Sequence, residues 1–504
     1  MKGVISSGDK RTSKAGALML KNGGNAYDAI CAAMLTSPLS EPMLTSVAGG
    51  GFLLSHGKDK GAELYDFFVD VTPSRVEKKD FFPIGVDFGT TIQEFHIGTA
   101  SVAVPGVLKG IYEIHKEKGK LPLQDIIKPA YDLAREGFYL SKMQAHFMQL
   151  LEPILMSTQS SKKLYTKDGE LIDHTHKFSN PDYAEFLKEF AKSGDSIFYE
   201  GSIADSIDKL SRQNNGDIRK EDLKNYKTVK REPIDFKFKD YEILTNTPPS
   251  AGGVLIAFAL QLLDKEDLGK FGSTQHISKL IESMVTTSDF RHEHINEFLH
   301  HAGLSSILND KKLMHGYFNA FKNRVNLWGN TTHVSVMDSD GNAASATTTN
   351  GEGSGVIVPD CGIMLNNMLG EEDLNPHGFF GWPDGVRLPS MMAPTIVLKN
   401  GKPQMVLGSA GSNRIRSAIT QSILNYTVFA HDIAEVTDEK RVHFEKGELF
   451  FEPGFDEDLI KKVKKHYPAS VFHDKSMFFG GVNAVTSDLK GGADPRRTGF
   501  VEVV

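Results

Sequence analysis

The chain has 504 residues, of which 40% are hydrophobic and 24% charged, and its formal net charge is −7. This length and this hydrophobic content suffice for a large buried core, and by length alone two or three domains would be expected. The negative net charge argues against general binding to nucleic acid or to an anionic membrane surface, so we expect neither partner.

The N-terminal residues and the two cysteines indicate a compartment. Met1 to Gly8 contain no apolar stretch of the signal-peptide kind, and the chain has no apolar run long enough to span a bilayer. We therefore expect a cytoplasmic protein, or one whose export signal has been removed. Cys31 and Cys361 lie in apolar surroundings, which predicts two buried thiols; a disulfide between them stays open.

Helical patterns dominate the first part of the chain. The predicted helices cover Ser13–Lys21, Tyr27–Leu35, Pro105–Lys118, Leu123–Arg135, Asp182–Ser193 and Ile277–His300. A hairpin is predicted near Pro233–Leu244. The segment Lys311–Asn330 is polar and weakly patterned, which suits a mobile linker from which a chain end could be released.

After Asn330 the pattern changes to short extended runs. These runs are Thr331–Met337, Ala343–Thr349, Thr395–Lys399 and Gln404–Leu407. The first two flank an Asp/Asn/Gly cluster and predict a hairpin. If its loop spans Asp338–Asn342, Thr331 lies directly opposite Thr349 with both side chains on one face. A tighter turn at Asp340-Gly341 would shift the register and send Thr349 to the other face.

A threonine hydroxyl is a weak nucleophile unless a base is near. Cleavage of the Asn330–Thr331 bond would supply one, because the new α-amine of Thr331 has a pKa of about 7.7–8.0 and can accept the proton of its own hydroxyl. An ordinary β-branched strand remains the simpler interpretation of this segment alone. His333 shares the strand face of Thr331, and with the amine as base we expect it to orient or pack.

The loop Gly408–Asn413 is the second candidate for chemistry. It follows an apolar run and precedes Arg414–Phe429, whose apolar residues recur at helical spacing. Backbone N–H groups that converge at a helix start suit a developing oxyanion. A plain strand-to-helix turn is the alternative, and a phosphate loop is disfavoured because the Lys and Ser/Thr of a Walker motif are missing.

Several short segments occur in the order known from one enzyme family. They are Gly23–Ala29, Glu41–Phe52, Val104–Gly106, Pro248–Gly253, Thr331–His333, Leu365–Asn367, Gly408–Gly411 and Asp494–Arg497. Through them nearly the whole chain resembles the γ-glutamyltranspeptidase family, a group of N-terminal nucleophile hydrolases.

The resemblance implies an α/β fold, a four-layer αββα sandwich built jointly by two subunits. A precursor would cut itself between Asn330 and Thr331 into a helix-rich large subunit, 1–330, and a strand-rich small subunit, 331–504, which stay associated as one folded body. Thr331 would be the nucleophile, with Thr349 beside it.

Further roles follow from the same resemblance. Gly411 and the backbone of Ser412 would bind the oxyanion. No metal and no organic cofactor is expected, because acyl transfer through a threonine ester requires neither. The partner would be a small γ-glutamyl substrate such as glutathione, and self-association into a homo-oligomer stays open.

Substrate recognition departs from the family pattern. A γ-glutamyl group carries an α-amine and an α-carboxylate, so a selective pocket needs an acid for the first and an Arg or hydroxyl donors for the second. Glu371 falls where the amine-binding acid belongs, but the usual Gln is Met368 and the usual Ser-Ser pair is Ser390-Met391.

The group that would bind the carboxylate is not evident. Arg75 or Lys78 must stand in for the family's arginine, and Asn350 corresponds loosely to an asparagine beyond the second threonine. The segment that forms a lid in some members is short here, between Pro376 and Arg387.

Three functions therefore stay open. The first is hydrolysis or transpeptidation of γ-glutamyl amides, with hydrolysis favoured because no acceptor-site residue can be named. The second is an amidase or acylase of the same mechanism, of the cephalosporin acylase kind, acting on another side-chain amide. The third is an uncleaved, inactive binding homologue. A metal site at Arg291–His294 is disfavoured because the His-Glu-x-x-His spacing is missing, so we interpret that segment as a solvated helix face.

Overall fold

The computed structural model describes residues 2–58, 61–87, 92–295, 299–300, 308, 331–376 and 378–504. The predicted linker Lys311–Asn330, with Asn330 at the expected cleavage site, lies outside these residues. No helix in the described ranges is both long and apolar enough to cross a membrane.

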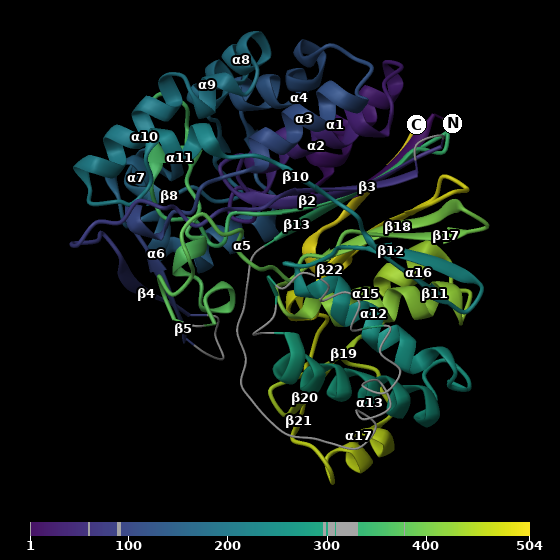
Figure 1. Cartoon of the computed structure of the whole chain (residues 1–504). Helices are drawn as coiled ribbons and strands as arrows, with labels where there is room; N and C mark the ends of the chain where they lie inside the picture. The colour runs from purple at the N-terminus through teal and green to yellow at the C-terminus, as the bar shows by residue number, and fades with distance from the viewer. Residues whose placement is uncertain are drawn as a thin grey trace.

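Two antiparallel sheets form the centre of the molecule (Figure 1). The first sheet has the strand order β10 (Val229–Arg231), β3 (Gly61–Phe67), β2 (Gly50–Gly57), β14 (Ala343–Thr349), β13 (Thr332–Asp338), β1 (Gly3–Ser7) and β24 (Phe500–Val503). The second has the order β11 (Ile234–Phe238), β12 (Tyr241–Thr245), β17 (Thr395–Lys399), β18 (Lys402–Ala410), β22 (Gly481–Thr486) and β23 (Gly491–Ala493). β13 packs on β18 and β22, so the two sheets lie face to face.

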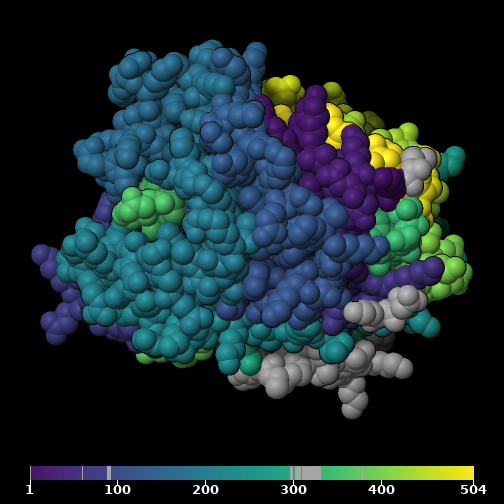
Figure 2. Space-filling model, turned by 90° about the horizontal axis from the view of Figure 1, so that it is seen from above, coloured from purple at the N-terminus to yellow at the C-terminus, as the bar shows by residue number. Residues whose placement is uncertain are grey.

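Helices cover the outer face of each sheet. Over the first sheet lie α1 (Lys10–Lys21), α2 (Ala26–Ser40), α3 (Val107–Lys118), α4 (Leu123–Glu136), α5 (Lys142–Leu150), α6 (Glu152–Leu155), α7 (Gln159–Tyr165), α8 (Pro181–Ser193), α9 (Ser196–Tyr199), α10 (Ser202–Gln213) and α11 (Lys220–Asn225). Figure 2 views this helical face from above, and most of its surface comes from the N-terminal half of the chain. On the second sheet lie α12 (Ala251–Asp264), α15 (Arg414–Thr427) and α16 (Ile433–Asp438), and α13 (Thr274–Phe290) packs on α12. The predicted αββα sandwich is confirmed.

Smaller elements complete the fold. The three-stranded sheet β19 (Val442–Glu445), β20 (Glu448–Phe451), β21 (Ala469–Val471) and helix α17 (Glu457–Val463) extend the α13 side. Two-stranded pairs are β4 (Phe82–Asp87) with β5 (Ile92–Ile97), β6 (Phe138–Tyr139) with β9 (Lys177–Phe178), β7 (Thr166–Lys167) with β8 (Glu170–Leu171), and β15 (Ile357–Val358) with β16 (Ile363–Met364).

Two cores explain why the strand β13 is buried throughout. Val334 and Val336 belong to the core between the first sheet and helices α1–α4, whereas Met337 belongs to the core on the side of the second sheet. Successive strand residues point to opposite faces, so Thr331 shares the face that looks at the second sheet. Position 331 therefore lies inside the sandwich, away from the helical layer.

Side-chain caps mark the start of several helices. Asn25 begins α2 with a capping box closed by Asp28, and Asp9 caps α1. The predicted helix Ile277–His300 is too long, because the α-helix ends at Phe290 and a π-helix, Arg291–Ile295, follows. Both cysteines are buried and free, which confirms the predicted thiols.

Candidate active site

The β13–β14 hairpin has the predicted register. Thr332 pairs with Thr348, and the pairing continues to the end of the hairpin with the loop that was expected. Extending this register by one residue puts Thr331 opposite Thr349. Both threonines are more than 90% buried, and both line an open cleft.

A buried acid, Glu41, contacts the start of β13 on the face opposite to Thr331. Thr332 Oγ1 donates a hydrogen bond of 2.6 Å to Glu41 Oε2, and Thr12 Oγ1 donates one of 3.2 Å to Glu41 Oε1. Burial, reinforced by the charge of Asp9, raises the pKa of Glu41 to about 8. The sequence marked Glu41 only as part of a family segment, and its contact with the residue after Thr331 emerges from the fold.

His333 is fully enclosed between the two sheets. Its Nδ1 lies 2.8 Å from Thr347 Oγ1 and its Nε2 lies 2.9 Å from Ser335 Oγ. Burial lowers the pKa of His333 to about 3, so the ring is neutral near neutral pH. Gly408 leaves room for the ring, because a Cβ there would lie 2.2 Å from His333 Cε1. These contacts agree with the orienting or packing role that was expected.

The glycine-rich loop is a sharp turn between β18 and α15. Gly411 has a φ of +114° and Ser412 a φ of +49°, after which α15 begins at Arg414. A positive φ of this size is accessible to glycine at low cost, which explains the residue at 411. Ser412 lines the same cleft as Thr331, and its Oγ donates to Asp373 Oδ2 at 2.7 Å. The turn thus brings Ser412 and the start of α15 to the wall of the cleft.

Three consecutive acids, Glu371, Glu372 and Asp373, line another part of the wall. Glu371 Oε1 is buried and has no hydrogen-bond partner among the described residues. Burial raises the pKa of Glu371 to about 8, and the charge of Asp373 adds to the rise. A cationic group in the cleft would stabilise the ionised form of this acid.

Ser390 and Met391 also line the cleft, so the single predicted hydroxyl belongs to its wall. Ser390 Oγ accepts a hydrogen bond of 3.0 Å from the Met392 N–H. Asn350 is buried beside Thr349 but is not part of the cleft lining. Its Oδ1 has no hydrogen-bond partner within the described ranges.

Arg75 and Lys78 are not brought to the cleft, and the expectation that one of them binds substrate needs correction. Arg75 Nη2 pairs with Asp384 Oδ1 at 2.8 Å, and its Nη1 lies 4.0 Å from Asp217. Lys78 is exposed to solvent. Their segment leads toward the surface after β3, and ion pairs there hold Arg75 away from the cleft.

Arg291 lines the cleft, which the sequence analysis did not predict. Among the described residues of the cleft lining it is the one basic side chain, and its Nη1 donates to Asn413 Oδ1 at 2.7 Å. The sequence analysis interpreted this segment as a solvated helix face. The pattern of polar and apolar residues indicates neither the π-helix that carries Arg291 nor the packing around it.

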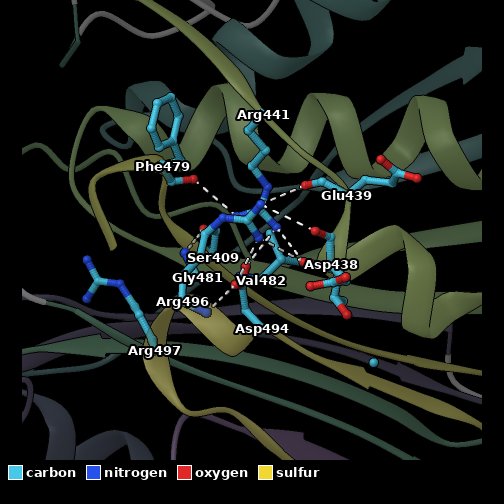
Figure 3. A network of polar contacts seen from close by, with 12 residues as sticks. Ser409, Asp438, Glu439, Arg441, Phe479, Gly481, Val482, Asp494, Arg496 and Arg497 are labelled. Carbon is cyan, nitrogen blue, oxygen red and sulfur yellow. Dashed lines mark hydrogen bonds and ion pairs between the residues drawn. The ribbon is translucent and has the colours of Figure 1, made fainter. Parts of the chain in front are cut away.

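The Asp494–Arg497 segment supports the second sheet near β22. Asp494 Oδ2 accepts from the Val482 N–H at 2.8 Å and pairs with Arg441 Nη2 at 2.7 Å, and Arg496 joins the same network (Figure 3). Arg497 points away from this network (Figure 3). Its Nη2 lies 3.5 Å from the place that a Cβ on Gly411 would occupy, so it packs behind the turn.

Comparison with known proteins gives one family. The family model described as Gamma-glutamyltranspeptidase matches residues 12–504. A glutathione hydrolase proenzyme of Escherichia coli (strain K12) is 28% identical over 497 residues, which cover 92% of this chain and 84% of that protein. An acylase ACY 1 proenzyme of Pseudomonas sp. (strain V22) is 30% identical, covering 92% and 86% respectively.

A solved structure has the same fold. The cephalosporin acylase from Bacillus halodurans superposes with a TM-score of 0.87 at 22% sequence identity, covering 99% of this chain and 95% of that one. The family match covers nearly the whole chain, and the named relatives are hydrolases and transpeptidases. This chain is therefore an enzyme of the gamma-glutamyltranspeptidase family.

Proposed function

We propose that the protein hydrolyses γ-glutamyl amides such as glutathione, or transfers their γ-glutamyl group, through an ester on Thr331. The observation that carries this proposal is the convergence of Thr331, Thr349 and the turn residue Ser412 on one cleft. The nucleophile would be released when the precursor cuts itself before Thr331. The partner is a small molecule, in keeping with the family.

The chemistry needs no group beyond the chain. The α-amine of Thr331 takes the hydroxyl proton while Oγ1 attacks the amide carbon, and the backbone N–H groups of Gly411 and Ser412 bind the resulting oxyanion. The C–N bond then breaks, the leaving amine takes the proton from the α-ammonium, and an ester remains on Oγ1. Water or an acceptor amine attacks this ester and releases the acyl group.

The three consecutive acids of the cleft lining, Glu371, Glu372 and Asp373, favour a substrate that carries an ammonium group. Oε1 of Glu371 is buried and has no hydrogen-bond partner among the described residues, so an α-ammonium in the cleft would compensate the cost of the ionised form. Ser390 adds a hydroxyl on the same cleft for the substrate's carboxylate.

The strand order supports two subunits, 1–330 and 331–504, that stay together after cleavage. In the first sheet, β13 and β14 of the small subunit lie between β2 and β1 of the large one. In the second sheet, β12 of the large subunit pairs with β17 of the small one. Separation would break backbone ladders in both sheets and expose both cores, so the fragments remain one folded body.

The decisive experiment compares wild type with Thr331→Ala. Intact mass and denaturing electrophoresis of the purified wild type should give two fragments, and N-terminal sequencing of the smaller should begin at Thr331. The variant should stay whole and lose all measurable turnover of a γ-glutamyl anilide. A wild type that stays whole and inactive on prolonged incubation would instead favour a binding homologue.

A second candidate is an amidase or acylase of the same mechanism with another acyl group. The apolar lining from Phe68, Leu374 and Met391 favours it, as does the likeness to acylases. Turnover of glutaryl and β-aspartyl anilides beside the γ-glutamyl anilide distinguishes the two. Equal rates on all three would remove the case for γ-glutamyl selectivity.

A further inference from the structure

The turn residue Ser412 has a backbone conformation that needs support from its surroundings. Its φ of +49° lies in the left-handed region, where a residue with a Cβ is disfavoured. The turn is also bonded directly to the helix that follows it. The Arg414 N–H donates to Gly411 O at 3.0 Å, and the Ile415 N–H donates to Ser412 O at 3.1 Å. The position of the first residues of α15 therefore determines the position of the turn.

A buried carboxylate, Glu445 at the end of β19, contacts these first residues. Asn413 precedes α15 but does not cap it with its side chain. Instead, Asn413 Nδ2 donates to Glu445 Oε1 at 2.9 Å, and Arg414 Nε lies 3.7 Å from Glu445 Oε2. Glu445 is not among the residues that line the cleft. It therefore contacts the start of α15 from outside the space in which a substrate would bind.

A second chain of hydrogen bonds orients Glu445 itself. Burial lowers the pKa of His443 to about 4, so the ring is neutral near neutral pH. Its Nε2 lies 3.2 Å from Glu445 Oε2, and its Nδ1 lies 2.7 Å from Ser417 Oγ. With the Nε2–H donating to the carboxylate, Nδ1 accepts from the hydroxyl of Ser417, a residue of α15. The acid is thus connected to the start of α15 at Asn413 and, through His443, at Ser417.

The carboxylate of Glu445 keeps its charge although it is buried. Burial alone would raise the pKa of Glu445, but the charge of Arg414 and the hydrogen bond from His443 hold it well below its usual range. An ionised carboxylate accepts stronger hydrogen bonds than a neutral acceptor, and its burial without partners is costly. Displacement of Asn413 from Glu445 is therefore unfavourable, which restrains the start of α15.

We propose that Glu445 is a positioning residue for the turn Gly411–Ser412, and that it acts through Asn413 and Arg414 on the rate of acyl transfer. The inference rests on the proposed function, in which this turn binds the oxyanion. The oxyanion develops only in the transition state, so a displaced turn lowers kcat and leaves the binding of ground-state ligands unchanged. The small sheet β19–β21 thereby contributes to catalysis without touching the substrate.

The test separates rate from binding, and both from stability. The kcat on the γ-glutamyl anilide, the Ki of glutamate as a competitive ligand and the Tm are measured for self-cleaved wild type, Glu445→Ala, Glu445→Gln and the control Glu452→Ala. Glu452 is a matched control because it is a buried acid that follows β20 of the same small sheet. Its hydrogen bonds come from Arg441, Ser476 and Arg496, which lie outside the turn.

For Glu445→Ala we expect kcat to fall roughly 10- to 100-fold, less than for loss of a whole oxyanion donor, because the turn is displaced and not removed. The Ki of glutamate should stay within about threefold of wild type. Glu445→Gln should lose less activity, because its amide oxygen still accepts from Asn413. Glu452→Ala should lower the Tm, since it breaks a buried ion pair, but its kcat should stay within about threefold of wild type.

Two results would overturn the proposal while the γ-glutamyl activity of wild type still stood. Equal losses of kcat in Glu445→Ala and Glu452→Ala would assign the effect to general destabilisation. A Ki of glutamate that rises as much as kcat falls would mean that Glu445 acts on binding and not on rate. A wild type without turnover of any anilide would instead refute the proposed function itself.

If Glu445→Ala fails to cleave itself, Asn413→Ala provides a second route. This variant breaks the contact between the acid and the residue after the turn, and it leaves the contacts of Glu445 with Arg414 and His443 in place. Its kcat should fall by a larger factor than its Ki for glutamate rises. An unchanged kcat would overturn the role of this contact and, with it, the proposal.

Discussion

The cleft has a reactive part and a recognition part, and the chain builds them in different ways. The proposed reactive part consists of Thr331, Thr349 and Ser412, with Gly411 in the same turn, and the proposed recognition part consists of the cleft-lining residues Glu371, Ser390 and Arg291. Two neighbouring strands and one turn position the first set through backbone geometry. Three segments far apart in the sequence position the second through side chains. Local rules therefore govern the proposed chemistry, whereas tertiary packing governs selectivity.

The largest expected effect tests the backbone geometry of the reactive part. Gly411→Ala places a Cβ at a φ of +114°, only 3.0 Å from Gly480 Cα, so the turn must move. We expect kcat on the γ-glutamyl anilide to fall roughly 10²- to 10³-fold, the range for a lost oxyanion donor.

Gly401→Ala is the matched control for this variant. Gly401 also has a positive φ, of +71°, but it lies in the β17–β18 turn with nothing within 4 Å of an added Cβ. Its activity should match wild type. A Gly411→Ala enzyme with normal kcat would contradict the role of this turn.

An intermediate effect tests the recognition part. Glu371→Gln removes the acid that would pair with the substrate's ammonium, and kcat/KM on the γ-glutamyl anilide should fall roughly 10- to 100-fold. The same change at the exposed neighbour Glu372 should cost much less, because its charge is hydrated. Similar losses in both variants would show that kcat/KM depends on the overall negative charge of the cleft and not on a contact between Glu371 and the substrate's ammonium.

The pH dependence sharpens this test. Because the pKa of Glu371 is raised to about 8, the free enzyme ionises this acid only as the pH passes that value. The ratio of kcat/KM for γ-glutamyl over glutaryl anilide should therefore rise with pH through about 8 in wild type. In Glu371→Gln the ratio should stay flat. The ratio cancels the titration of the Thr331 α-amine, which affects both substrates alike.

The smallest effect concerns the support behind the nucleophile. Glu41→Gln keeps the shape of the side chain that receives Thr332, so activity at pH 7 should stay within about threefold of wild type. Since burial raises the folded-state pKa of Glu41 from 4.5 to about 8, the folded state binds more protons than the unfolded state between these values. Its contribution to stability is thus present at low pH and is lost as the pH rises toward 8.

Thermal unfolding between pH 5 and pH 9 measures this contribution. The Tm of wild type should fall more steeply over this range than that of Glu41→Gln. Parallel profiles would mean that Glu41 ionises at an ordinary pH and does not couple to the strand end.

The reactive part could be predicted because its signals are short-range. A five-residue loop determined the hairpin register, and an apolar run followed by glycine and a helical pattern indicated the turn before α15. The acid Glu371 followed from the family resemblance. Arg75 and Lys78 do not line the cleft. The ion pair of Arg75 with Asp384 joins residues far apart in the sequence, so the order of residues along the chain could not predict it.

By itself, the sequence determined the helices with caps, the hairpin that sets Thr331 opposite Thr349, and the family. The folded arrangement was needed to show that Arg291 lines the cleft, that Glu41 contacts Thr332, and that strands of both prospective subunits take part in each sheet. The physical reason is the range of the interactions. Register, turns and caps depend on hydrogen bonds between near neighbours, whereas the charges of the cleft meet through packing of segments that are up to several hundred residues apart.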